Sequence, residues 1–360
     1  QDPLLFTVKR DKIPILSLDA SYMIQPKTGY IRINRFGATT AEEFKKAMTS
    51  LQKQGMKNLI LDLQGNGGGY LNAAIDLANE FLGQKELIVY TEGRTAKRSD
   101  FYAKGNGDFR TGRLIILVDE YTASASEIVS GAVQDWDRGI IVGRRSFGKG
   151  LVQRPIDLPD GSMIRLTIAR YYTPAGRCIQ KTDYNKDLIE RFNHGELMNA
   201  DSIHFPDSLK VQTKKLKRTV YGGGGIMPDY FVPIDTTLYT DYHRNLVGKG
   251  VIIKFTMKFI EDHRKELADK YKKFEHFNEK FIIDDDMLAT LREMGEKEGV
   301  KFNEEQYQKS LPLIKTQLKA LIARDLWDMN EYFRVMNATN ESVQKALEIL
   351  NSGEYQKKLK

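Results

Sequence analysis

The sequence predicts an α/β fold followed by a mainly α-helical C-terminal extension. Two patterns support this prediction. From about residue 28 to 235, short apolar segments typical of strands alternate with segments of helical spacing. From about residue 236 onward, helical spacing dominates and strand signals are few. With 360 residues, of which 41% are apolar and 29% charged, the chain is globular and long enough for two units.

The first part of the chain alternates strand and helix in order. Residues 30–36 alternate apolar and polar side chains like a strand, and Phe44, Met48 and Leu51 then repeat at helical spacing. The further expected elements are a strand at 59–63, a helix at 71–82, strands at 86–90 and 114–118, a helix from about 124 to 136, and a short strand at 140–142.

The C-terminal extension carries apolar residues at helical spacing in four segments. These segments are 251–264, 287–298, 305–326 and 342–350. Pro312 is expected to break or kink the third, because proline cannot donate the helical hydrogen bond. Apolar faces of this kind mostly pack in a core. The alternatives are a homo-oligomer formed through these helices, or a cap that guides substrate.

A serine and a lysine each lie in a turn of small residues after an apolar segment. Ser124 follows residues 114–118, and Lys149, flanked by glycines, follows residues 140–142. Two strands that end in such turns can deliver a hydroxyl and an amine to one edge of a sheet. Serine needs a neighbouring group to take its proton, and lysine can do so when burial in a dry turn keeps it neutral. The pair predicts a serine nucleophile with a lysine general base.

The turns around this pair contain two further candidates. The glycine-rich residues 65–69 follow the strand expected at 59–63, and glycine lets backbone N–H groups face a substrate oxyanion. Glu127 is as consistent with capping the helix that begins near Ser124, or with pairing to an arginine, as with touching substrate.

Nucleotide binding is a weaker alternative. Residues 143–149 fit the first seven positions of a phosphate-binding P-loop, but Gly150 stands where Ser or Thr would hold magnesium. Residues 151–159 then resemble a β-segment rather than the required helix. The glycine run also begins a dinucleotide fingerprint, whose last glycine is replaced by Tyr70. We therefore expect no nucleotide and no organic cofactor.

Composition excludes several other classes. The net charge of +7 is moderate and the basic stretches are mixed with acids or lie in expected loops, so we expect no nucleic-acid partner. None of the five histidines pair at metal-ligand spacing, so no metal site is expected. Cys178 is the only cysteine, and no apolar run reaches the roughly 18 residues of a membrane span.

Several segments resemble, in the same order, the tail-specific or C-terminal processing serine proteases. They are residues 60–69, 124–127, 147–150, 169–177 and 222–229, and together they span roughly residues 28 to 235. The resemblance implies a crotonase-like stack of βαβ units with Ser124 as nucleophile and Lys149 as general base. It also aligns Gln153 with the glutamine that holds this lysine.

The same resemblance implies the oxyanion hole and exposes two departures. The amide of Gly68 or Gly69, between which the sequence does not choose, would act with the amide of Ala125. Gln64 stands where an arginine is usual, and so lacks a charge that supports the neighbouring turn. Members of the family usually carry a PDZ domain before the core, whereas residues 1–27 resemble only its last strand and exit.

The expected organisation is therefore a PDZ exit strand and linker at 1–27, a catalytic core at 28–235 and a helical domain at 236–360. The predicted function is a serine endopeptidase that cuts protein or peptide substrates near an apolar C-terminus through an acyl-enzyme. A latent or non-catalytic peptide-binding scaffold of the same fold is the alternative. Because members of this family are mostly exported, the resemblance implies a periplasmic or otherwise extracytoplasmic location.

Overall fold

The computed structural model describes residues 6, 8–11, 15–181 and 188–360. The strands are β1 Leu18–Gln25, β2 Thr28–Ile33, β3 Asn58–Asp62, β4 Leu87–Glu92, β5 Ser99–Tyr102, β6 Arg113–Val118, β7 Ile140–Gly143, β8 Leu151–Asp157, β9 Met163–Tyr172, β10 Lys210–Gln212, β11 Thr219–Tyr221 and β12 Tyr230–Phe231. The helices are α1 Thr40–Lys53, α2 Leu71–Asn79, α3 Ala125–Asp135, α4 Leu188–Asn193, α5 Asp241–Gly248, α6 Val251–Lys270, α7 Phe274–Lys280, α8 Asp285–Lys297, α9 Glu304–Leu326, α10 Met329–Met336, α11 Glu341–Ser352 and α12 Glu354–Lys358. Two short 3₁₀ turns lie at Ala200–Ser202 and Asp207–Leu209.

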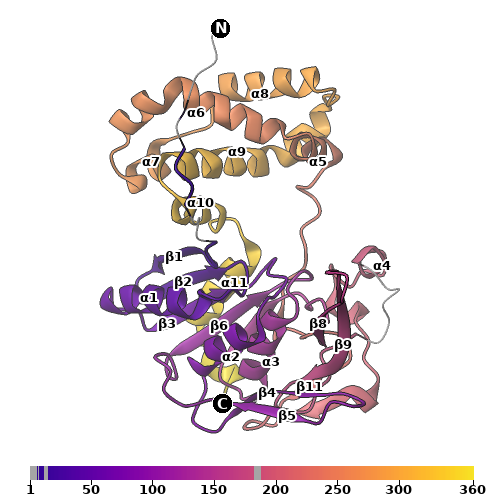
Figure 1. The fold of residues 1–360 in the computed structure, drawn as a ribbon. Helices are drawn as coiled ribbons and strands as arrows, with labels where there is room; N and C mark the ends of the chain where they lie inside the picture. Colours follow the sequence, from indigo (N-terminus) through magenta and orange to yellow (C-terminus); the bar gives the residue numbers. More distant parts are fainter. Residues whose placement is uncertain (1–5, 7, 12–14, 182–187) are drawn as a thin grey trace.

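A six-stranded sheet of order β1-β2-β3-β6-β7-β12 forms the centre of the α/β part (Figure 1). Strands β2, β3, β6, β7 and β12 are parallel, and β1 is an antiparallel edge strand. The carboxyl ends of β3, β6 and β7 therefore lie at one edge. The glycine run, Ser124 and Lys149 all follow these strand ends, so the topology brings the three turns together.

Helices cover both faces of this sheet, as a mostly parallel sheet requires. On one face, α1, α2 and α3 bury Phe44, Leu77 and Val129 in the largest core. On the other face, apolar side chains of α11 and α12 pack against the inner strands; they include Val343, Ala346, Ile349, Leu350 and Tyr355. The C-terminal end of the chain thus returns to the sheet (Figure 1).

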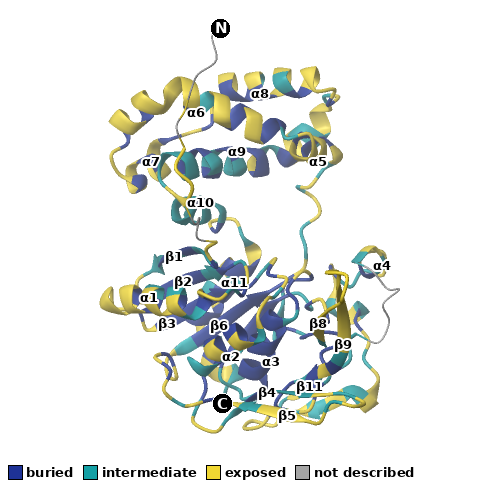
Figure 2. Cartoon of the chain, viewed as in Figure 1, coloured by how far each residue is buried: buried dark blue, intermediate teal, exposed yellow. Residues whose placement is uncertain are grey.

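A second, antiparallel sheet of order β5-β4-β9-β8 lies beside the main one. Its β8–β9 hairpin is exposed along residues 153–167, as the yellow colour in Figure 2 shows. Because β8 is the edge strand and follows Lys149 directly, the hairpin begins next to the candidate site.

Helices α5 to α10, which we call the helical unit (residues 241–336), have a core of their own. Phe255, Phe277, Ile314 and Leu318 are among its buried side chains. The predicted break at Pro312 is wrong, because α9 continues from Glu304 to Leu326 with this proline inside it. One face of α9 is buried on both sides of the proline, and this packing stabilises the continuous helix.

The α/β class and the helical C-terminal extension are confirmed, but the structure divides the chain differently from the expected boundaries. Residues 18–25 form β1 of the main sheet rather than a linker, because Ala20 and Tyr22 are buried in the sheet's second core. Residues 341–358 pack on the sheet rather than in the helical unit, because the apolar stripe of α11 covers the face that α1 to α3 leave open.

Candidate active site

Ser124 lies in the sharp turn between β6 and α3. Its backbone has φ +57° and ψ −113°, a combination that residues other than glycine rarely adopt. The turn is fixed by Thr122, whose hydroxyl donates to the Leu63 carbonyl at 2.9 Å and whose N–H donates to Asp119 Oδ1 at 2.9 Å. Backbone strain of this kind occurs where a nucleophile is displayed between a strand and a helix. Ser124 is half-buried at the edge of the sheet.

The glycine run at 65–69 packs directly against this serine turn. Gly68 has φ +98°, and a Cβ atom added there would lie 2.8 Å from Ser124 Cβ and 2.8 Å from the Ala123 carbonyl oxygen. Gly69 has φ +150°, and an added Cβ would lie 2.0 Å from the Phe36 carbonyl oxygen. Only glycine fits at these two positions.

The hydrogen bonds of this turn distinguish the two candidate oxyanion donors. The N–H of Gly68 already donates to Asn66 Oδ1 at 2.8 Å. In the described part of the chain, the N–H of Gly69 makes no hydrogen bond. Ala125 is the first residue of α3, so its N–H has no acceptor within the helix. This geometry favours Gly69 over Gly68.

The fully buried carboxylate of Glu127 joins the serine turn to the lysine loop. Its Oε2 accepts the N–H of Ser124 at 2.7 Å and the N–H of Lys149 at 2.9 Å. Its Oε1 accepts the N–H of Gly148 at 2.7 Å and the Ser146 hydroxyl at 2.5 Å. Burial raises the pKa of the Glu127 carboxyl above its ordinary value, and these four hydrogen bonds partly offset that effect.

The lysine loop is anchored by its backbone. Phe147 N–H donates to the Thr122 carbonyl at 2.9 Å, which ties the loop to the serine turn a second time. Gly150 packs so closely on the next segment that an added Cβ would lie 2.5 Å from the Gln180 nitrogen. Ser146 exchanges hydrogen bonds with Ile226, so the glycine-rich residues 222–226 brace the loop.

The side chain of Lys149 does not occupy the dry turn that the sequence predicts. It is exposed, and among the described residues no hydrogen bond joins it to Ser124 or to Gln153. Gln153 is also exposed; it lies on β8 opposite Thr167, just after an irregularity in the strand pairing. The close packing predicted for the flanking glycines is present, but it buries their backbone and not the lysine side chain. Glu127 therefore joins the backbones of Ser124 and Lys149, whereas among the described residues no hydrogen bond joins their side chains.

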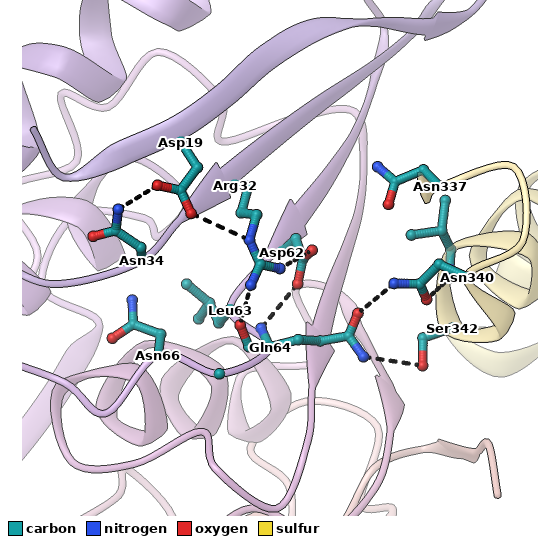
Figure 3. Close-up of polar contacts among 12 residues, drawn as sticks. Asp19, Arg32, Asn34, Asp62, Leu63, Gln64, Asn66, Asn337, Asn340 and Ser342 are labelled. Carbon is teal, nitrogen blue, oxygen red and sulfur yellow. Dashed lines mark hydrogen bonds and ion pairs between the residues drawn. The ribbon is translucent and has the colours of Figure 1, made fainter. Parts of the chain in front are cut away.

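An ion pair between the half-buried Arg32 and the buried Asp62 supports the glycine turn. Asp62, at the end of β3, accepts a hydrogen bond from Tyr30 Oη at 2.5 Å and one from Arg32 Nη1 at 2.5 Å. Figure 3 shows the contact with Arg32. Arg32 Nη2 also donates to the Gln64 carbonyl at 2.8 Å. Arg32 therefore places a cation beside the turn that begins at Gln64.

The sequence left Glu127 open between helix capping, an ion pair with an arginine and substrate contact, and the structure shows the capping contact; it gave Arg32 no role. The signal for Glu127 was its spacing of three residues from Ser124, which is the spacing of a capping box. Arg32 carried no signal of its own, because its role depends on the parallel register that places it opposite Asp62.

The described residues contain neither a membrane-spanning helix nor a cluster of metal ligands. None of their helices is long and apolar enough to cross a membrane. Within the same residues, no group of three or more His, Cys, Asp or Glu side chains has an arrangement that could hold a metal ion.

A serine on a strained strand-to-helix turn, a facing glycine turn and an adjoining lysine loop define a serine-type peptidase site. Comparison with known families agrees: residues 27–189 match the model of peptidase family S41. Residues 242–328, in the helical unit, match a family of unknown function, DUF8443.

Individual relatives are similar over the same part of the chain. The carboxyl-terminal-processing protease of Picosynechococcus sp. is 44% identical over 191 residues, which cover 52% of this chain and 46% of that protein. The protein of the same name from Synechocystis sp. is 42% identical over 219 residues, covering 59% and 50%. A solved structure described as photosystem II D1 C-terminal processing protease has a TM-score of 0.45 and 29% identity, covering 63% of this chain and 51% of that one. The chain spans about half the length of these relatives.

Proposed function

We propose that this chain is a serine endopeptidase that hydrolyses peptide bonds of protein substrates, at or near their C-termini, with Ser124 as nucleophile. The observation that carries the proposal is the buried Glu127 carboxylate, which binds the backbones of Ser124 and Lys149 at 2.7 and 2.9 Å. It holds a strained serine and a lysine-bearing loop at one edge of a sheet, where the glycine turn faces them. The names of the relatives support the C-terminal preference.

In the proposed reaction, neutral Lys149 takes the proton of Ser124 as Oγ attacks the substrate carbonyl carbon. The N–H groups of Gly69 and Ala125 stabilise the resulting oxyanion, and such a donor is worth about 100- to 1000-fold in rate. The carbon–nitrogen bond then breaks and the Lys149 ammonium protonates the leaving amine. Water attacks the acyl-enzyme, Lys149 accepts its proton, and Ser124 recovers its own. Gln153 would orient the amine through its amide oxygen.

For this chemistry, the Lys149 amine must move to hydrogen-bonding distance of the Ser124 hydroxyl. Catalytic hydrogen bonds are often formed only in the substrate complex, so the unliganded arrangement does not oppose the mechanism. The exposed Lys149 side chain does favour one second candidate: a latent protease or peptide-binding scaffold whose dyad is not aligned at rest.

Cleavage of an unfolded protein such as β-casein tests the proposal. The parent chain is compared with Ser124→Ala and Lys149→Ala in the presence of a chelator. We expect the parent to cleave and each variant to lose activity by about 1000-fold or more while melting at the parent's temperature. Equal cleavage by all three would assign the activity to another site or a contaminant. Peptide binding without cleavage by the parent would favour the scaffold.

We further propose that the chain self-associates and that it is located outside the cytoplasm. Self-association through the C-terminal helices is supported by Ile253 and Met257 of α6, which are 51% and 61% exposed. A monomeric mass by light scattering at high concentration would overturn this self-association.

A periplasmic or other extracytoplasmic location rests on the family resemblance alone, and fractionation of cells that produce the protein tests it.

A further inference from the structure

Gln64 connects the glycine turn to a distant part of the chain. Its backbone is fixed at the start of the turn, where its N–H donates to Asp62 Oδ1 at 2.8 Å and its carbonyl accepts Arg32 Nη2 at 2.8 Å. Its side chain leaves the turn and reaches the N-terminus of α11, as Figure 3 shows. There Oε1 accepts Asn340 Nδ2 at 3.2 Å, and Nε2 donates to Ser342 Oγ at 3.4 Å.

The partners of Gln64 are themselves fixed. Asn340 is the N-cap of α11, and its Oδ1 accepts the N–H of Val343 at 3.2 Å. The side chain of Ser342 is buried, and Val343 anchors the helix in the core beneath the sheet. The amide of Gln64 therefore joins a loop to a firmly packed helix end. A neutral amide suits this position because it can both accept and donate, and Arg32 already supplies the cation for Asp62.

The other end of the connection is the candidate oxyanion hole. Gly65 N–H donates to Asp119 Oδ1 at 3.0 Å, and Asn66 fixes the N–H of Gly68. The Asn66 carbonyl accepts Ala123 N–H at 2.9 Å and Ser126 Oγ at 3.0 Å, on either side of the nucleophile. A displacement of Gln64 would thus change the position of the turn relative to the serine.

The contact between Gln64 and the N-terminus of α11 lies where the glycine turn, α11 and the helical unit meet. Gln64, Gly65, Asn340 and Ser342 line a cavity of about 390 Å³, whose opposite wall comes from the helical unit at Pro312 and Tyr332, among others. The segment between α10 and α11, which leads from the helical unit to the sheet, also lines this cavity, at Asn337, Thr339 and Asn340.

We propose that Gln64 is a positioning residue that fastens the oxyanion turn to the N-terminus of α11. The C-terminal segment thereby sets how Gly69 presents its N–H to substrate. This inference rests on the proposed function, in that it assigns the turn a part in catalysis. The physical link itself does not depend on catalysis.

Two substitutions break the link from its two sides. Gln64→Ala removes both hydrogen bonds of the amide. Asn340→Ser removes the amide that reaches Gln64 but keeps a good N-cap for α11. The matched control is Gln25→Ala, because Gln25 on β1 makes an equivalent amide pair with Asn351 at the other end of α11, at 3.2 Å.

The first measurement is amide hydrogen exchange of the intact chain, followed by mass spectrometry of the peptide that covers residues 64–70. We expect both Gln64→Ala and Asn340→Ser to speed exchange there by about threefold or more, and Gln25→Ala to leave it unchanged. Unchanged exchange in Gln64→Ala, or an equal effect of Gln25→Ala, would overturn the proposal.

The second measurement is the kinetics of peptide cleavage. We expect kcat to fall about 3- to 10-fold in both link variants, with KM changed less than about twofold. The double variant should be no slower than Gln64→Ala, because Gln64→Ala already removes the hydrogen bond that Asn340→Ser removes. A rise in KM alone, or additive losses, would contradict the positioning role. If the parent does not cleave, the proposed function fails, while hydrogen exchange still decides whether Gln64 holds the turn.

Discussion

At the scale of single residues, the candidate site depends on close approach of two turns. Gly67 and Gly68 are adjacent in the glycine turn but have different surroundings. A Cβ on Gly67 would meet no atom within 4 Å, whereas on Gly68 it would lie 2.8 Å from Ser124 Cβ. Gly68 also has φ +98°, which disfavours any other residue. Alanine substitutions at Gly67 and Gly68 add the same methyl group, so a comparison of the two shows the effect of its position.

We predict that Gly68→Ala lowers kcat by about 100-fold or more, because the turn must retreat from Ser124 and carries the oxyanion donor with it. The strained backbone and the overpacking should also lower stability by about 1–3 kcal/mol. Cleavage assays and thermal melting measure the two effects. Gly67→Ala is the control and should stay within about twofold of the parent. Equal losses in both variants would contradict this account of the turn.

Glu127 organises the site through its hydrogen bonds. Its carboxylate accepts from four donors, three backbone N–H groups and the Ser146 hydroxyl. A carboxylate offers only acceptors, whereas an amide would place an NH₂ group against two of these donors. The same side chain thus caps α3 and shapes the lysine loop.

At the scale of elements, α10 is the helix that joins the helical unit to the sheet. Asn330 Oδ1 accepts the Ser21 N–H of β1 at 2.7 Å, and Asn337 Nδ2 donates to Tyr22 Oη at 2.8 Å. In the first turn of α10, Glu331 lies beside Asp328, and the positive charge of Arg334 partly compensates the two carboxylates. Burial and then the Asp328 carboxylate raise the pKa of Glu331 from 4.5 to about 7.

We predict that Glu331→Gln raises the melting temperature at pH 8 and has little effect at pH 5. An unfolded chain loses this proton near pH 4.5 and the folded protein near pH 7. In that window the folded state binds more protons, so the stability of the parent falls as pH rises. Glutamine has no proton to lose in this range, so the variant avoids this fall in stability. Melting curves from pH 5 to 8 test this, with the exposed Glu293→Gln as control; a gap between parent and variant that does not grow with pH would contradict it.

Sequence patterns predicted these elements with uneven success. Strand and helix periods located β3, β6, α2 and α3, because each has a clear apolar face. The break predicted at Pro312 was wrong because the tertiary packing of α9 outweighs the lost helical hydrogen bond. In the site, the turns of Ser124 and the glycine run could be found from composition. The exposure of the Lys149 side chain, the hydrogen bonding that favours Gly69 over Gly68, and the contacts of Arg32 and Gln64 could not, because they depend on contacts between distant segments.

At the scale of the whole molecule, three hydrophobic cores do not correspond to three segments of sequence. The core beneath the sheet combines Ile60, Ile115 and Val142 of the inner strands with Val343 and Ile349 of α11. The helical unit is thus inserted between the sheet and the last helices that complete it. Periodicity identifies α11 as a helix but does not say which apolar surface it covers.

We therefore predict that residues 15–235 alone do not form a stable domain, although the sequence places the whole catalytic core within residues 28–235. Without α11, the second face of the sheet is exposed. Burial of one Val, Leu or Ile side chain is worth about 1.5–3 kcal/mol. The lost contacts of Val343, Ile349 and Leu350 would therefore remove a large part of a typical stability of about 5–15 kcal/mol.

The control is a chain in which a Gly/Ser linker replaces the helical unit, residues 241–336, while α11 and α12 are kept. Because α5 to α10 have their own core, this chain should retain the complete sheet and both of its covering layers. We expect it to be soluble and to melt cooperatively, whereas 15–235 should aggregate or be degraded quickly in limited proteolysis. Cooperative melting of 15–235 would mean that α11 is dispensable to the sheet. If both fragments failed, the helical unit would also be needed to hold α11 in place.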